Sequence, residues 1–123
     1  MKAIYIKQIY ADCGDVVMSF KPQVMVVDIE NSLSGFQRIL GCQTIDIQSR
    51  TVNGKDYDFV CDDNALTNKV SIITVESKSN SDKNLIGNII ICNHDGQGNE
   101  ASLSDDDVKM LLSNVGEFSF VID

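Results

Sequence analysis

The sequence predicts an α+β domain, built mainly on an antiparallel β-sheet of about seven short strands with two short helices. Three observations predict it. Short β-branched runs of strand length recur along the chain, Asn53-Gly54 separates two of them as a tight hairpin turn would, and only two segments show helical spacing of apolar residues. With 123 residues and an apolar fraction of 43%, the chain is expected to form a single domain, 1–123, whose core needs no metal or disulfide.

The first third of the chain is expected to contribute three strands, at residues 2–10, 16–20 and 24–29. Each is short and rich in Ile, Val or Tyr, the residue types that favour strands. Residues 12–15 have the composition of a turn. Pro22, the only proline, is expected to separate the second strand from the third, because proline has no N–H to give to a sheet ladder.

A first helix is expected directly after these strands. Asn31 or Ser32 can cap its first turn, since both side chains accept hydrogen bonds from backbone N–H groups. Gly41 fits the position just past its end, where a left-handed residue is favoured. Apolar residues at helical spacing form one stripe: Leu33, Phe36, Ile39 and Leu40.

A β-hairpin is expected at residues 44–61, with Asn53-Gly54 as its two-residue loop, because both residues tolerate positive φ. This loop fixes the register, so that Ile47 faces Val60 and Gln48 faces Phe59. The two faces of the hairpin are then both partly apolar. One face has Ile45, Ile47 and Val60, and the other has Val52, Tyr57, Phe59 and Cys61.

The second half is expected to hold strands at residues 70–75, 85–93 and 117–122. Residues 77–84 contain no apolar side chain and are expected to form a mobile loop. The Gly-rich residues 95–99 predict a reversal of the chain.

A second helix is expected to begin near Ser104. Ser104 and Asp107 have the spacing of a capping box, and the aspartates at 105–107 suit the positive end of the helix dipole. Gly116 is expected to end this helix. Its predicted apolar stripe is Val108, Leu111, Leu112 and Val115.

The sequence offers few parts for metal binding. None of the cysteines lies at the Cys-x-x-Cys spacing of a zinc site. Residues 93–104 resemble a calcium loop only in part, since Ser104 stands where the bidentate Glu is needed. No metal and no cofactor are therefore expected, and the thiols are expected to be reduced and mostly packed as small apolar groups: Cys13, Cys42, Cys61 and Cys92.

Catalytic parts are equally sparse, because the chain has a single histidine, His94, and no cysteine or serine with an evident base. A non-enzymatic protein is expected. The net charge of −8, with Arg38 and Arg50 as the only arginines and no basic run, makes direct nucleic-acid binding unexpected. No apolar run reaches membrane-span length and no signal peptide is evident, so we expect a cytoplasmic protein with no membrane contact.

Three pieces of the chain together resemble a family of small acidic domains of unknown function found in phages, plasmids and conjugative elements of bacteria. The pieces are 29–45, with the run Gln37-Arg38-Ile39-Leu40-Gly41, then 60–64, with Cys61-Asp62-Asp63, and 86–106, with Ser102-Leu103-Ser104-Asp105. The resemblance implies an origin in a mobile element. It implies no activity and no site residues.

Two functional hypotheses follow. The first is a non-enzymatic accessory protein of a phage or mobile element, which binds a host or element protein and acts against a host defence or as an acidic mimic. The alternative is a small-ligand binder that captures a nucleotide-type signal in a pocket or at a subunit interface. Its candidate ligand-binding residues are Arg38, Arg50, Tyr57 and Phe59, with Phe36 as a further aromatic platform. The sequence leaves open whether the chain forms a homo-oligomer.

Overall fold

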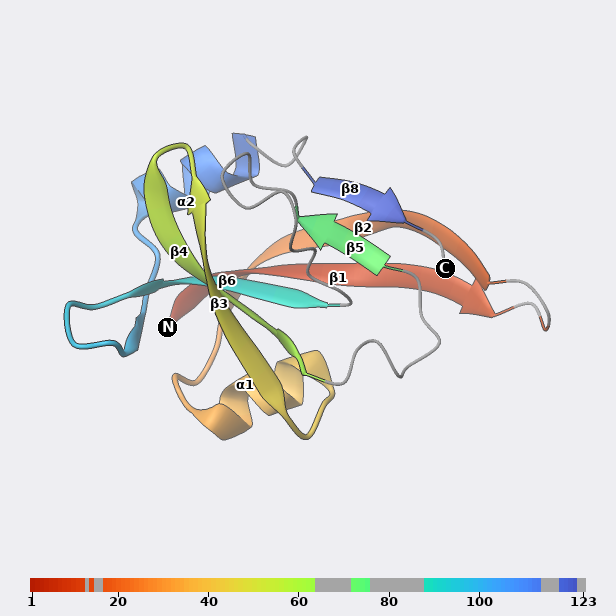
Figure 1. The fold of residues 1–123 in the computed structure, drawn as a ribbon, viewed down its shortest axis with the longest axis horizontal. Coiled ribbons are helices and arrows are strands. Elements are labelled where there is room, and N and C mark those ends of the chain that lie inside the picture. Colours follow the sequence, from red (N-terminus) through yellow and green to blue (C-terminus); the bar gives the residue numbers. More distant parts are fainter. Residues whose placement is uncertain (13, 15–16, 64–71, 76–87, 114–117, 122–123) are drawn as a thin grey trace.

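The computed structural model describes residues 1–12, 14, 17–63, 72–75, 88–113 and 118–121. The main sheet is antiparallel, with the strand order β2-β1-β6-β4-β3 (Figure 1). The short β7 pairs with β6. Strands β5 and β8 pair with each other in a separate sheet. The elements are β1 (Lys2–Asp12), β2 (Val17–Asp28), α1 (Leu33–Leu40), β3 (Ile45–Val52), β4 (Lys55–Asp62), β5 (Ile72–Val75), β6 (Ile89–His94), β7 (Glu100–Ala101), α2 (Asp105–Ser113) and β8 (Phe118–Val121). The predicted α+β class is confirmed, with six strands in the main sheet.

Both faces of the main sheet are buried, each by one helix. On the α2 face, Leu111 of α2 joins a core of Ile4, Ile6, Val52, Tyr57, Phe59, Cys61, Ile89, Ile91 and Leu103. On the α1 face, Phe36 and Leu40 of α1 join Ala3, Tyr5, Ile29, Val60, Ile90 and Cys92. Central β6 therefore reads Ile-Ile-Ile-Cys without polar alternation, because side chains on both of its faces are covered.

Helix α1 begins and ends where the sequence predicts. The Ser32 hydroxyl accepts a hydrogen bond from the Gly35 N–H, and Gly41 has φ 67° at the C-terminal end. The predicted apolar stripe is wrong at Leu33, whose side chain is 58% exposed. Gly35 faces inward, where an added Cβ would overlap the backbone carbonyl of Glu30. The buried side of α1 is formed by Gly35, Phe36 and Leu40, and Leu33 in the first turn lies outside it.

The β3–β4 hairpin has the predicted loop and register. Asn53 and Gly54 have φ 52° and 83°, as a tight two-residue turn requires, and Ile47 pairs with Val60. The two predicted faces are also confirmed, since Val60 lies in the α1-face core and Phe59 in the α2-face core.

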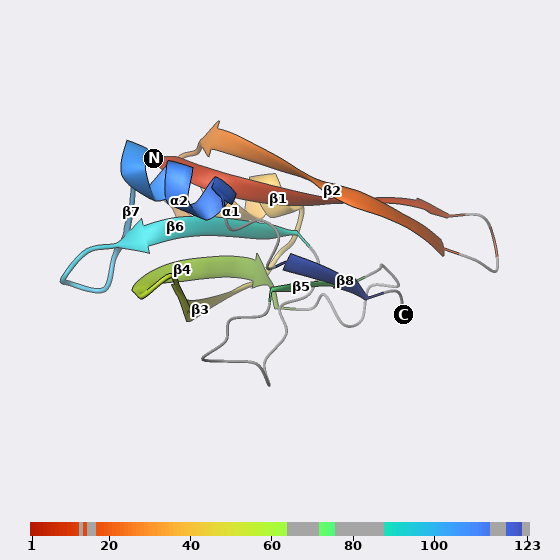
Figure 2. The ribbon, with the colours of Figure 1, turned by 90° about the horizontal axis from the view of Figure 1, so that it is seen from above.

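One predicted boundary is wrong: residues 17–28 form the single strand β2, and Pro22 lies inside it. The reason is that β2 is an edge strand and its pairing with β1 shifts between Lys7 and Ile9. At a bulge on an edge strand, the absence of a backbone N–H in proline interrupts no hydrogen-bond ladder between strands. Among the described residues, β1 pairs with β6 at Ile4–Ile6, and the far part of the β1–β2 ribbon runs past the end of β6 (Figure 2).

Toward the C-terminus, the predicted strands are present as β5, β6 and β8, and residues 95–98 form the predicted reversal after β6. Strand β7 was not predicted. In α2 the apolar stripe is wrong at Leu112, which is 40% exposed, while Asp107 is buried. The expected loop at 77–84, and the predicted roles of Val115 and Gly116, lie outside the described residues. Neither described helix is long and apolar enough to cross a membrane.

Candidate functional site

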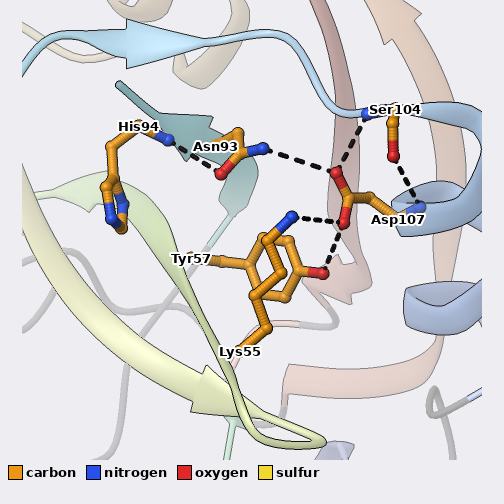
Figure 3. A network of polar contacts seen from close by, with 6 residues as sticks. All are labelled: Lys55, Tyr57, Asn93, His94, Ser104 and Asp107. Atoms are coloured by element: carbon orange, nitrogen blue, oxygen red, sulfur yellow. Dashed lines mark hydrogen bonds and ion pairs between the residues drawn. The ribbon is translucent and has the colours of Figure 1, made fainter. Parts of the chain in front are cut away.

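Two polar clusters lie at the C-terminal end of β6, on opposite faces of the sheet. Successive strand residues point to opposite faces, so Asn93 reaches the α2 face and His94 the α1 face. We call the first cluster the Asp107 network; its members are Lys55, Tyr57, Asn93, Ser104 and Asp107 (Figure 3). We call the second the Glu100 cluster; its members are Asp58, Cys92, His94 and Glu100.

The Asp107 network is centred on one carboxylate that is only 7% exposed. Its Oδ1 accepts hydrogen bonds from Lys55 Nζ at 2.8 Å and from the Tyr57 hydroxyl at 2.7 Å (Figure 3). Its Oδ2 accepts one from the Ser104 backbone N–H at 3.0 Å and a longer one, 3.4 Å, from Asn93 Nδ2. The Asp107 N–H donates to Ser104 Oγ, which completes the predicted capping box.

These contacts decide the charge of Asp107. Burial alone raises the pKa of this carboxyl, but the hydrogen bonds from Lys55, the Ser104 backbone and Tyr57 outweigh it and hold the pKa well below its usual range. Burial and the contact with Asp107 raise the pKa of Tyr57. At neutral pH the network is therefore an ionised carboxylate held by a lysine and a neutral phenol. It joins α2 to the β3–β4 hairpin.

The Glu100 cluster brings acidic groups against one another. His94 Nδ1 lies 3.2 Å from Asp58 Oδ1, and the Asp58 side chain is 13% exposed. Glu100, on β7, shares a hydrogen bond with Asp58, and the Cys92 thiol lies 3.9 Å from Glu100 Oε2. The sheet register explains the meeting, because Asp58 pairs with Cys92 and His94 pairs with Glu100.

Glu100 has too few donors to remain fully charged at neutral pH. Burial, the hydrogen bond and charge of Asp58 and the charge of Asp95 together raise its pKa to about 7, against a smaller lowering by the hydrogen bond from Cys92. Glu100 can therefore take up and release a proton near neutral pH. Burial and the nearby carboxylates raise the pKa of Cys92 to about 12, so this thiol stays protonated. No group of three or more His, Cys, Asp or Glu in the described part of the chain is arranged to hold a metal ion.

The structure brings together three of the four candidate ligand-binding residues. Arg50 and Tyr57 are cross-strand partners, and Phe59 is the next residue on the same face of β4. Arg38 lies apart, exposed on α1, which covers the opposite face. Tyr57 and Phe59 are 1% and 0% exposed, so both rings are packed in the core. Phe36 is buried in the α1-face core.

Arg50 is among the largest fully buried side chains of the described residues, at 2% exposure. Its Nη2 donates to Gln48 Oε1 at 2.8 Å, and Gln48 Nε2 donates to Asp46 Oδ2 at 2.8 Å. This row of alternate residues runs along the α2 face of β3. Polar residues at every second position of a strand ordinarily indicate its solvent-facing side, so no pattern in the sequence predicted the burial of Arg50.

Sequence reasoning missed most of both clusters. The capping-box pattern found Ser104 and Asp107 but not the contacts of Asp107 with Lys55 and Tyr57. Nothing predicted that Glu100 would meet Asp58, because β7 has only two residues and its pairing with β6 leaves no pattern of its own.

The DUF3846 family, described as a domain of unknown function, matches residues 16–116 of the chain. The chain belongs to this family. The matched segment contains β2 through α2, and therefore both helices, the β3–β4 hairpin and both polar clusters. The resemblance to a family of domains of unknown function is confirmed at that level. Neither the curated proteins nor the solved structures contain a match.

Proposed function

We propose that this chain is a non-enzymatic accessory protein of a phage or mobile element that acts in the cytoplasm by binding another protein. The observation that carries the proposal is the outer edge of β3. This strand ends the sheet order, and no described strand pairs with its far side. An eight-residue edge offers a row of backbone donors and acceptors, which proteins commonly use to bind one another.

The charge of the chain supports the same class of function. An excess of carboxylates repels nucleic acid and favours contact with proteins that carry basic surfaces. The mobile-element context comes from the sequence resemblance, and action against a host defence or as an acidic mimic would suit a protein with such a surface.

Site-specific photo-cross-linking in the host cell tests the proposal. A photo-reactive amino acid is placed at Ser49, which is exposed on β3, and in a control protein at Val26, which is 48% exposed on the other edge strand. We expect a discrete protein to be cross-linked from Ser49. Adducts only with nucleic acid, or no adduct from any exposed position tried, would contradict a protein-binding role.

The same purified protein tests the nucleotide-binding alternative. A nucleotide that binds the native state raises the melting temperature by mass action. Because Arg50 and Tyr57 are buried, such a ligand would have to uncover them. A nucleotide-dependent rise that is lost in Arg50→Gln would favour the alternative over the accessory-protein proposal.

A further inference from the structure

The two edges of the main sheet differ in how they are protected against an added strand. Strand β2 contains Lys21-Pro22 and a shift of register opposite them, and proline, lysine and bulges are the features that commonly protect sheet edges. Strand β3 has none of these. Its pairing with β4 is continuous from Ile45–Asp62 to Val52–Lys55, and it contains no proline and no lysine.

The outward backbone groups of β3 follow from the hairpin. In a two-residue loop the closing pair, here Val52 and Lys55, is hydrogen bonded, and the bonded pairs then alternate along the ladder. The backbone N–H and C=O groups that point away from β4 are those of Ile45, Ile47, Ser49 and Thr51. Their side chains lie on the α1 face, where Ile47 is 41% exposed and Ser49 is exposed. The edge therefore combines a regular backbone row with one accessible apolar side chain.

The described residues around this edge carry mainly negative charge. Residues 45–63 contain five aspartates against one arginine and one lysine. The arginine, Arg50, is buried, and the lysine, Lys55, forms an ion pair with Asp107. The N-terminal β1–β2 ribbon differs, because residues 1–28 contain three lysines and three aspartates. The aspartates of the hairpin are Asp46, Asp56, Asp58, Asp62 and Asp63.

We propose that the β3 edge binds an extended, basic segment of a protein partner, which adds to the sheet as a further strand. The proposal rests on the protein-binding function above and names the chemistry of the partner. Backbone hydrogen bonds to Ile47, Ser49 and Thr51 supply sequence-independent affinity, and Ile47 receives an apolar side chain at one alternate position. The surrounding aspartates select lysine and arginine in the partner segment and repel an acidic one.

Hydrogen exchange at single amides tests this geometry in two steps. In the free protein the amides of Ile47, Ser49 and Thr51 should exchange fast, while those of Gln48, Arg50 and Val52, bonded to β4, should be protected. Protection of the first set in the free protein would mean that the chain covers its own edge, and would overturn the proposal.

The second step adds two matched pools of ten-residue peptides, in which Val, Thr or Tyr alternates with Lys and Arg in one pool and with Asp and Glu in the other. The basic pool should slow exchange at the three outward amides and bind at least about tenfold more tightly than the acidic pool. Binding should weaken as salt is raised beyond physiological strength. Equal binding of both pools, or protection elsewhere only, would overturn the proposal.

Two variants separate the edge from the rest of the surface. Ile47→Lys adds a charge that repels a basic strand and leaves the backbone unchanged, whereas Val26→Lys makes the same change at a similarly exposed position on β2. We expect about tenfold weaker peptide binding for Ile47→Lys and no change for Val26→Lys. If cross-linking captures a partner through a surface other than β3, the protein-binding function stands and the assignment to this edge is wrong.

Discussion

Asp107 and Glu100 lie at the same end of β6, on opposite faces of the sheet, and their carboxyl groups have opposite pKa shifts. Asp107 is the more buried of the two, yet it is the one that stays ionised. Its oxygens accept hydrogen bonds from a lysine, a phenol, a backbone N–H and an amide. Glu100 instead faces Asp58, a second carboxyl group.

The comparison shows that the donors around a carboxyl group, rather than its burial alone, decide its charge here. Burial disfavours the ionised form on both faces. On the α2 face the Asp107 network supplies enough donors to reverse this effect. On the α1 face a like charge adds to it. We therefore expect the α2 face to be stabilised by an ionised carboxylate, and the stability contributed by the α1 face to depend on pH near neutrality.

Asp107→Ala should have the largest effect on the free energy of unfolding, a loss of about 3 kcal/mol. The substitution leaves the buried Tyr57 hydroxyl without its acceptor and removes the capping box at Ser104. Urea unfolding at pH 7 measures it. The matched control is Asp106→Ala, an exposed first-turn residue whose loss should cost under about 1 kcal/mol. Equal losses for the two variants would show that the network does not stabilise the fold.

Tyr57→Phe should cost about 1.5 kcal/mol, because it removes one charge-assisted hydrogen bond and leaves the ring packed in the core. The control is Tyr5→Phe, a buried tyrosine of the α1 face for which no hydroxyl contact is found within the described ranges. The difference between the two variants isolates the contact with Asp107. A loss of stability for Tyr5→Phe as large as that for Tyr57→Phe would show that the hydrogen bond to Asp107 adds no stability of its own.

The sequence predicted those features that depend on residues close together in the chain. Asn53-Gly54 fixed the hairpin register, and the Ser104/Asp107 spacing predicted the capping box, because both depend on residues a few positions apart. The partners Lys55 and Tyr57 lie 52 and 50 positions from Asp107, and no local pattern connects them. The strand through Pro22 was missed because a proline is acceptable only on an edge, and strand order is a tertiary property.

The predicted apolar stripe of α1 was wrong at Leu33 for a related reason. Helical periodicity shows that one side of a helix is apolar but not which part of that side meets the sheet. The buried side of α1 consists of Gly35, which lies close to the Glu30 carbonyl, with Phe36 and Leu40, and Leu33 lies outside it. The candidate ligand residues Arg50 and Tyr57 were placed on a common face by the register, and their deep burial came from packing that the register does not contain.

The smallest predicted effect is a pH dependence that belongs to Glu100. Its folded-state pKa, about 7, is above its ordinary value of 4.5, so the stabilising proton is fully bound below about pH 4.5 and is lost as the pH rises through 7. Stability should therefore fall over this interval, by about 1 kcal/mol after allowance for solvent screening. The contribution of Asp107 to stability has the opposite pH dependence and changes at lower pH. Because the pKa of Asp107 is depressed, this contribution is present above about pH 4 and is lost in stronger acid.

Glu100→Gln tests this assignment, because the amide keeps a donor for Asp58 and does not titrate. The groups that face Glu100 are Asp58, Asp95, Cys92 and, through Asp58, His94. Urea unfolding of the wild type at pH 4.5, 6 and 7.5 should show the decline, and the variant should be flat over the same range. Glu30→Gln, at an exposed position before α1, should retain the wild-type decline. A decline that persists unchanged in Glu100→Gln would assign the titration to a neighbour in the cluster, and the contrast between the two faces would then no longer rest on Glu100.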